Sequence, residues 1–337
     1  MRILPFRRHG RWGYIDGESK VVKDATFRWA GYFHGQKAVV VDGVCNCIID
    51  ASFQVCTRFP PGVDIDEAFS DGLAVACHNN ERWFYVDEQG KDVFHMSFDL
   101  AFPFVDGVAF VKHGARWGLI SRDGRWLKHP AWRNVHRFIK GQGKTSVQIE
   151  DSRKWIFIDS EGERIGRSDF DNLGGVVDEV APYGYNTKRG MKYGLVRLTG
   201  EVLVPAQFES CEQTVSDKTL GVEYDDGAWG VIDIEGKSLI PPSYLYAGQY
   251  SEGFFVVYSG GRRDLNNHVG GGKYGFISRA NECLCGFQFD LADPFKDGVS
   301  RVHWRPPGVS DPSEEVDFSD MFMGYVDTAG RILWKEQ

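Results

Sequence analysis

The chain has 337 residues, a length that allows either two or three ordinary domains or one array of repeats. Its composition is that of a folded, aromatic-rich protein, since 42% of the residues are hydrophobic and 10 Trp, 13 Tyr and 24 Phe are present. The net charge of −8 and the dispersed basic residues argue against a general nucleic-acid binder, because neutralising phosphates needs clustered Lys and Arg. An acidic surface suits a basic protein partner better.

The first ten residues, MRILPFRRHG, contain no long apolar run and do not read as a secretory signal. No stretch reaches the roughly 18 apolar residues of a membrane span. Seven cysteines, an odd number, fit free thiols in a reducing compartment better than a disulfide framework. We therefore expect a cytoplasmic protein that does not bind membranes.

A five-residue core recurs along the chain: an aromatic residue, a glycine, two apolar residues and a final Asp or Ser. Clear copies begin at Trp12, Trp117, Trp229 and Tyr274, and degenerate copies begin at Asn46, Trp83, Trp155, Tyr193 and Met323. The starts at 12, 46, 83, 117, 155, 193, 229, 274 and 323 are separated by 34, 37, 34, 38, 38, 36, 45 and 49 residues. A fixed phase with two late insertions is typical of a repeat protein.

Each core leads into a tight turn, as in Asp87 to Gly90 and Asp233 to Gly236. Asp or another loop residue opens the turn and Gly supplies a positive φ, which predicts a hairpin loop that closes with a G1-type bulge. A short apolar run ended by proline follows, as in Leu239-Ile240-Pro241, and predicts a second strand.

About twenty residues after most cores comes an aromatic-x-x-Gly element. It spans Tyr32 to Gly35, Phe69 to Gly72, Phe104 to Gly107, Phe138 to Gly141, Tyr250 to Gly253 and Phe295 to Gly298. The apolar residues that follow predict a third strand leading into the next core, so each repeat is expected to be a three-stranded antiparallel meander without helices. The fifth and sixth repeats lack a clean Phe-x-x-Gly, and the second lacks the aromatic-Gly pair.

The Trp-Gly pair, the Tyr-Ile-Asp after it, the Gly-Lys turn and the Phe-x-x-Gly-x-Ala-x-Val element together resemble the WG-repeat family. The resemblance covers almost the whole chain. It implies a mainly bacterial, non-catalytic repeat scaffold whose partners are generally unknown. It carries over no active-site residues.

The recurring residues have a structural reason. A buried Trp or Tyr covers roughly 150–250 Å², which is worth on the order of 4–6 kcal/mol before entropy is subtracted. A repeat of about 35 residues cannot bury such a face alone and must stack on its neighbour. The adjacent Gly lets a backbone approach where a Cβ would clash. We therefore favour core stacking over an exposed aromatic platform for sugars.

We predict one all-β WG-repeat array over residues 1–337, with eight to nine three-stranded antiparallel repeats. An open, twisted, β-solenoid-like array is favoured over a closed β-propeller. Four-stranded propeller blades run about 40–45 residues, which is longer than the basic repeat, and the chain starts and ends in nearly the same phase.

A glycine motif, Gly270-x-Gly272-x-x-Gly275, matches the dinucleotide fingerprint. No helix is expected after it and Gly275 belongs to a repeat core, so the match carries no cofactor prediction. No Gly-x-Ser-x-Gly, His-Glu-x-x-His or Walker-type loop occurs. We expect no enzyme activity and no cofactor.

Two residue types could bind metal. The pairs Cys45-x-Cys47 and Cys283-x-Cys285 could supply four zinc ligands, but their spacing is tight and their repeats are distant, so core thiols on strands are expected. The nine histidines show no spacing typical of metal or acid–base sites, and His113, His129 and His136 fall in separate loops or strands. No metal site is predicted.

Two insertions, at residues 259–272 and 305–320, interrupt the regular spacing. Loops extended on one repeat of an array are where binding tends to be placed. The second insertion supplies the candidate binding residues Asp311, Glu314, Glu315, Asp317, Phe318 and Asp320. Such an acidic-aromatic loop could dock into a basic cleft, and the alternative is a solvated hairpin tip. The smaller group Asp64, Asp66 and Glu67 has the same two interpretations.

The leading hypothesis is a non-catalytic scaffold that binds another protein across the array. Its concrete version is an inhibitor or immunity protein that covers the site of a basic toxin or nuclease. The alternatives are a carbohydrate- or envelope-binding module and an enzyme with an unrecognised site.

Overall fold

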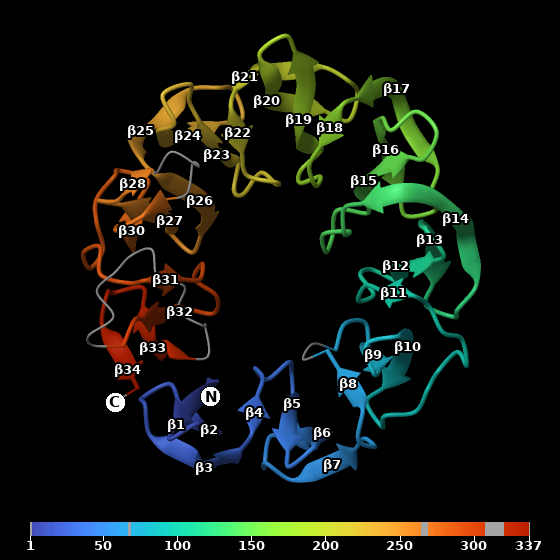
Figure 1. Ribbon diagram of the computed structural model, residues 1–337, viewed down its shortest axis with the longest axis vertical. Coiled ribbons are helices and arrows are strands. Elements are labelled where there is room, and N and C mark those ends of the chain that lie inside the picture. Colours follow the sequence, from blue (N-terminus) through green and yellow to red (C-terminus); the bar gives the residue numbers. More distant parts are fainter. Residues whose placement is uncertain (1, 67–68, 264–268, 307–319, 337) are drawn as a thin grey trace. The chain divides into compact units, whose positions relative to one another are not determined.

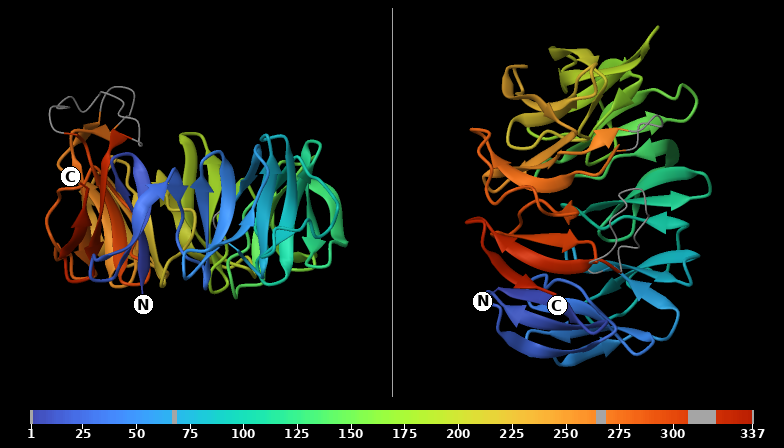
Figure 2. Two further views of the ribbon diagram at one scale, coloured as in Figure 1. Left: turned by 90° about the horizontal axis from the view of Figure 1, so that it is seen from below. Right: turned by 60° about the vertical axis from the view of Figure 1, so that its left-hand side comes forward.

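The computed structural model describes residues 2–66, 69–263, 269–306 and 320–336. They form two compact halves, Met1–Asp169 and Phe170–Gln337. The described residues consist of strands and turns with no α-helix, and every pairing between named strands is antiparallel within a small sheet, as Figures 1 and 2 show. The all-β prediction is confirmed.

The N-terminal half contains four sheets. The first is β1 (Ile3–Arg8), β2 (Arg11–Asp16) and β3 (Val21–Phe27), and the second is β4 (Trp29–Ala30), β5 (Lys37–Asp42), β6 (Cys45–Asp50) and β7 (Val55–Arg58). The third is β8 (Val63–Ile65), β9 (Leu73–His78) and β10 (Arg82–Asp87). The fourth is β11 (Leu100–Ala101), β12 (Val108–His113), β13 (Arg116–Ser121), β14 (Trp126–Val135), β15 (Lys144–Ile149), β16 (Trp155–Asp159) and β17 (Arg164–Phe170).

The C-terminal half repeats the pattern. Its first two sheets are β18 (Asn172–Leu173), β19 (Val180–Thr187), β20 (Gly190–Arg197) and β21 (Val202–Phe208), then β22 (Ser210–Cys211), β23 (Thr219–Glu223), β24 (Trp229–Asp233) and β25 (Ser238–Tyr244). The next is β26 (Tyr246–Ser251), β27 (Phe254–Ser259) and β30 (Lys273–Ser278), with the inserted pair β28 (Arg262–Arg263) and β29 (Val269–Gly270) between them. The last is β31 (Leu291–Ala292), β32 (Val299–Trp304), β33 (Phe322–Asp327) and β34 (Ile332–Lys335).

A complete repeat has four strands rather than the three predicted. All nine predicted cores lie in strands, namely β2, β6, β10, β13, β16, β20, β24, β30 and β33. The additional strand is the first of the repeat and in most repeats has only two residues, as in β4 and β11, although β26 has six. Two residues are too few to show an alternating pattern, which explains why the sequence did not reveal this strand.

The turn after each core has the predicted geometry. In the third repeat, the Asp87 carboxylate accepts hydrogen bonds from the backbone N–H groups of Gln89 at 3.0 Å and Lys91 at 2.9 Å. Gly90 has a φ of 77°, and its N–H donates to the Asp87 carbonyl at 2.8 Å. The same carboxylate pattern occurs at Asp16, Asp50, Asp159, Asp233 and Asp327. The final Asp of the core is therefore a turn cap.

The core glycine lies where the last strand of the same repeat crosses closest. A Cβ on Gly13 would lie 2.4 Å from the Lys23 carbonyl oxygen, and one on Gly194 would lie 2.3 Å from that of Val204. A register shift interrupts the pairing at each of these glycines. In the second repeat Cys47 takes the glycine position and pairs with Arg58 without such a shift, so no glycine is needed there.

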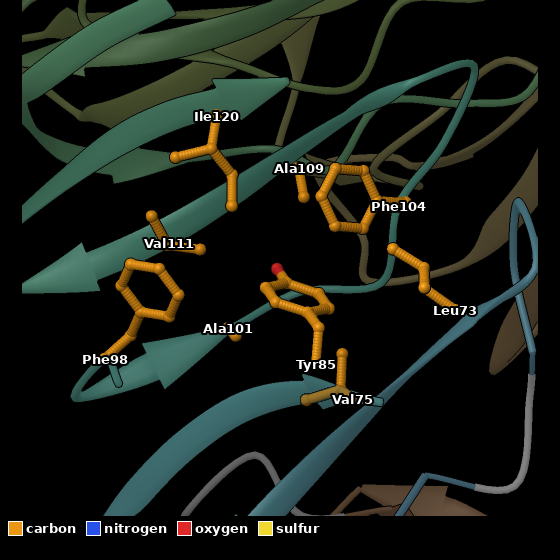
Figure 3. Packing of buried hydrophobic residues seen from close by; sticks show 9 residues of the cluster. All are labelled: Leu73, Val75, Tyr85, Phe98, Ala101, Phe104, Ala109, Val111 and Ile120. Carbon is orange, nitrogen blue, oxygen red and sulfur yellow. The ribbon is translucent and has the colours of Figure 1, made fainter. Parts of the chain in front are cut away.

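Aromatic rings stack consecutive repeats on one another, as predicted. Figure 3 shows the Tyr85 ring between residues of its own sheet, such as Val75, and residues of the next repeat, such as Phe104. The Tyr85 hydroxyl donates to the Phe102 carbonyl oxygen at 2.7 Å, and burial raises the pKa of this phenol. Tyr14 makes the equivalent bond to the Gly31 carbonyl at 2.9 Å.

The Phe-x-x-Gly elements form tight turns that link neighbouring repeats. The Asp71 carboxylate accepts the N–H of Gly107 at 2.7 Å, and the Asp106 carboxylate accepts that of Gly141 at 2.5 Å. In the two repeats without the full motif, Val176 and Val215 are buried at the anchor position. Glu179 and Lys218 then take the glycine place with φ of 64° and 60°. The turn therefore persists where its sequence motif is lost.

Candidate binding groove

The predicted acidic binding loop falls almost wholly outside the described residues. Asp311, Glu314, Glu315, Asp317 and Phe318 lie there, and Asp320, at its edge, is exposed. In the smaller acidic group, Asp64 accepts a hydrogen bond from the Asn46 side chain at 3.0 Å and Asp66 is exposed, whereas Glu67 lies outside the described residues.

The third repeat lacks the glycine of its core, as do the second repeat with Cys47 and the fifth with Ile156. Phe84 stands there, whereas the fourth repeat has Gly118. A Cβ on Gly118 would lie 2.5 Å from the Trp126 ring and 2.8 Å from the Lys128 carbonyl oxygen. The residues after the third core therefore cannot follow the path that β14 takes over Gly118.

Residues 91–99 take a different path. They form no continuous strand with β10: two isolated bridges join Val86 with Asp92 and Trp83 with Phe98, and between them the Val93 N–H donates to the Tyr85 carbonyl at 3.0 Å. Between these bridges the chain turns at His95, which has a φ of +54°, a conformation uncommon for a residue other than glycine. The Asp92 carboxylate holds this turn by accepting the N–H groups of Phe94 at 3.2 Å and His95 at 2.9 Å.

A groove runs beside this turn, and its first part is polar. This part has a volume of about 590 Å³ and is lined by Phe84 together with His78, Glu81, Arg82, Asp92 and His95. The Nδ1 atom of His95 lies 3.8 Å from the nearer Asp92 oxygen. Glu81 and Arg82 are exposed on the hairpin between β9 and β10. Charged side chains of both signs therefore surround this part.

The second part of the groove is mainly apolar. It has a volume of about 350 Å³, shares Met96 and Ser97 with the first part, and is lined further by Phe98, His113, Trp126, His129 and Pro130. The imidazole of His129 stacks on the Trp126 indole, with centroids 5.5 Å apart and planes at 26°. Phe98 meets the same indole edge-on at 6.1 Å.

Four of the nine histidines of the chain line this one groove. The sequence prediction placed His113 and His129 in separate elements, and it did not foresee that β12 and β14 bring them to one surface. The pair Trp83-Phe84 was not a sufficient signal, because the fifth repeat has Ile156 at the same position and its β17 still pairs with β16. No group of three or more His, Cys, Asp or Glu side chains suited to a metal ion occurs in the described ranges.

The cysteines follow the prediction only in part. All seven are free thiols, and Cys47 is buried in β6. Cys283 and Cys285 do not lie on a strand, because the residues after the eighth core turn aside as those after the third do, and Cys283 is exposed. The expectation of strand-borne core thiols is therefore wrong for this pair.

One carboxyl in the C-terminal half has a shifted pKa. Burial raises the pKa of Glu212, and a hydrogen bond with the Tyr246 hydroxyl partly opposes this shift. Tyr246, Tyr258 and Tyr274 form a row of directly paired residues across β26, β27 and β30. Shifted acids are often functional, but this one is explained by its packing against tyrosines.

The fold and the groove define a class: an all-β protein of repeated small antiparallel sheets, with a surface groove where one repeat departs from the pattern. The sequence model for the WG containing repeat matches residues 12–43, 83–116 and 229–262. Three segments of the chain therefore match the WG repeat, and the resemblance predicted from the sequence is confirmed at these segments. The second match contains Phe84 and the turn at His95, whereas other groove residues, such as Glu81 and Trp126, lie outside it.

Several solved structures are similar in fold. The computationally designed Ika8 protein aligns with a TM-score of 0.50 at 11% identity, over 88% of this chain and 95% of that chain. Dihydro-heme d1 dehydrogenase NirN in complex with DHE gives 0.49 at 10% identity, over 90% and 74%. BamB from Moraxella catarrhalis gives 0.45 at 10% identity, over 80% and 91%. At 11% identity, the likeness to the Ika8 protein concerns the fold alone.

No curated protein matches the chain in sequence. Within the described residues there is no helix with the length and apolar character needed to cross a membrane.

Proposed function

We propose that this protein is a non-catalytic scaffold that binds another protein, and that the groove beside residues 91–99 is a contact site. The observation that carries the proposal is the departure of residues 91–99 from the regular strand path beside Phe84. This departure leaves an apolar part and a charged part next to each other. Apolar surface that fixes a side chain, with polar groups that orient it, is typical of binding sites.

The recurring residues of the repeat support this assignment because each already has a structural role. The core carboxylates cap turns, the core glycines admit a neighbouring strand, and the rings fill the interfaces between repeats. Differences between the repeats of this chain therefore fall on residues without such a structural role, such as those at the groove.

The partner that we propose is a basic protein in the cytoplasm, which makes an inhibitor or immunity protein against a basic toxin the concrete version. The net charge of −8 supports it. The acidic loop from Asp311 to Asp320 is the proposed second contact.

The test is affinity capture from the cells that make the protein, with the product of the adjacent reading frame as the first candidate. We compare the natural chain with Trp126→Ala, and use Phe287→Ala as the matched control because Phe287 is an exposed aromatic in the eighth repeat. We expect Trp126→Ala alone to lose the captured partner. A partner retained by this variant would remove the groove from the proposal.

The acidic loop is tested separately. Charge reversal at Glu314, Glu315 and Asp317 is expected to weaken capture of a basic partner. Unchanged affinity would discard the loop while leaving the groove in place.

A carbohydrate-binding module is the second candidate, because the Trp126 indole is half-buried at the groove and could stack on a sugar ring. Glycan-array binding that is lost in Trp126→Ala and kept in Phe287→Ala would favour it over protein binding.

For the arrangement of the repeats we retain the open twisted array as the proposal, with eight to nine repeats. Four-stranded sheets are the composition of propeller blades, which supports the closed alternative. Fluorescence energy transfer between labels near the two termini distinguishes them, because a closed ring gives high transfer and an open array gives low transfer.

A further inference from the structure

We propose that the groove accepts a basic segment of the partner, with an apolar side chain in its apolar part and an arginine or lysine in its polar part, and that acidification releases this segment. This inference rests on the proposed function and specifies the chemistry of the ligand. It follows from how charges and imidazoles are distributed along the groove.

The apolar part fits one flat or branched side chain. Phe98 and the Trp126 indole meet edge-on, and the flexible Met96 borders both parts of the groove. A volume of about 350 Å³ admits one such side chain rather than a folded surface. The apolar part therefore holds one apolar side chain of the ligand as an anchor. The polar part then selects the charge of the neighbouring ligand residue.

The fixed charges of the polar part favour a cation. Asp92 and Glu81 contribute two negative charges and Arg82 contributes one positive charge, so the net fixed charge is −2 + 1 = −1. One Asp92 oxygen is committed to the turn at His95, whereas the exposed Glu81 makes no hydrogen bond or ion pair that the described structure records. Glu81 is therefore the carboxylate best placed to pair with an incoming guanidinium or ammonium group.

The imidazoles reverse this preference when they are protonated. His78 and His95 lie at the polar part, and His113 and His129 at the apolar part. Histidine is the side chain that most readily gains charge between pH 8 and 5. Protonation of all four changes the sum to −1 + 4 = +3, with Glu81, Asp92 and Arg82 as the other charged groups that line the groove. A basic segment bound at neutral pH is then repelled.

The probes are two capped tripeptides, Trp-Ser-Arg and Trp-Ser-Glu, titrated into the full chain by isothermal calorimetry at pH 7.5 and 5.5. We expect the arginine peptide to bind about tenfold more tightly than the glutamate peptide at pH 7.5 and to weaken about tenfold at pH 5.5. Glu81→Gln is expected to lose about fivefold for the arginine peptide. The matched control Asp225→Asn removes one carboxylate from the equivalent exposed hairpin of the seventh repeat and should change nothing.

The double variant His95→Gln with His129→Gln should flatten the pH dependence while leaving binding at pH 7.5 within about twofold. Tighter binding of the glutamate peptide at pH 7.5, or affinity for the arginine peptide that does not fall at pH 5.5, would overturn the inference. Absence of binding by both peptides would overturn the inference as well. If Trp126→Ala still abolished capture of the partner in that case, the proposed function would be kept and only the inference about the ligand's chemistry would be discarded.

Discussion

The third and eighth repeats break the regular pattern in the same place, yet they fill the resulting space differently. Both turn aside after the core, at His95 with a φ of +54° and at Gly286 with a φ of 82°. In the eighth repeat Phe287 lies over the core glycine, since a Cβ on Gly275 would be 2.6 Å from its ring. In the third repeat the ring belongs to Phe84, a residue of the core segment, and the turning segment beside it borders a groove.

The glycine position alone does not decide the path of the last strand, because the fifth repeat has Ile156 there and its β17 still pairs with β16. What differs between the third and eighth repeats is the side chain that covers the core. With Gly275, Phe287 from the turning segment covers it. With Phe84 in the core, the side chains of the turning segment line the groove instead.

The largest effect is expected where a side chain is forced onto a regular repeat. Gly118→Val would place carbon atoms against the Trp126 ring and the Lys128 carbonyl, where even a Cβ would lie within 2.8 Å. We expect a loss of about 3 kcal/mol in the free energy of unfolding, measured by urea denaturation. Phe84→Leu, which changes one side chain for another at the equivalent position, should cost less than about 1.5 kcal/mol. Similar costs for the two would show that the glycine position does not differ between these repeats.

A smaller effect tests whether the third repeat is still anchored on the fourth despite the groove. Tyr85→Phe removes the hydrogen bond to the Phe102 carbonyl, which is 2.7 Å long, and should cost about 1–2 kcal/mol. Because the pKa of Tyr85 is raised above its ordinary value of 10.0, its contribution is complete below that pH and is lost as the pH rises further. Stability should therefore fall less steeply with pH above 10.0 in the variant than in the natural chain, and an equal slope would contradict this role.

The link between successive turns gives a third test. Asp71→Ala removes the acceptor of the Gly107 N–H and is expected to lower the free energy of unfolding by about 1 kcal/mol. Asp297 occupies the equivalent turn near the end of the chain, and no hydrogen bond or ion pair of its carboxylate is recorded within the described ranges. Asp297→Ala should therefore be nearly neutral in the same denaturation experiment. Equal losses would mean that the inter-repeat bond contributes nothing.

The smallest effect has the opposite sign and concerns the C-terminal half. Burial raises the pKa of Glu212 above its ordinary value of 4.5, so its folded form prefers the neutral carboxyl and stability declines as the pH rises above that value. Glu212→Gln should therefore raise the denaturation midpoint at pH 7 by an amount equivalent to less than about 1 kcal/mol. The gain should disappear near pH 4, and a gain that persisted there would need another cause than charge burial.

The sequence predicted those features that each repeat needs by itself. The Asp-capped turns, the core glycine at a close strand crossing and the buried rings all follow from local chemistry repeated at a fixed spacing. The two-residue first strand was missed because it is too short to carry a pattern. The groove was missed because it depends on the path of residues that come seven to fifteen positions after Phe84, which no local pattern in the sequence reveals. The candidate residues were instead sought in the acidic insertion, most of which lies outside the described residues.

The Gly107 N–H donates to the Asp71 carboxylate, and the Gly141 N–H donates to the Asp106 carboxylate. These bonds connect each repeat to the next in the same way, so the chain is modular. Each such turn offers an acceptor to its successor and a donor to its predecessor, so a whole repeat can be duplicated or exchanged with its connections intact. A fragment of a repeat cannot. Transplanting residues 78–130, which include every residue that lines the groove, is therefore a rational route to a second groove on the same scaffold.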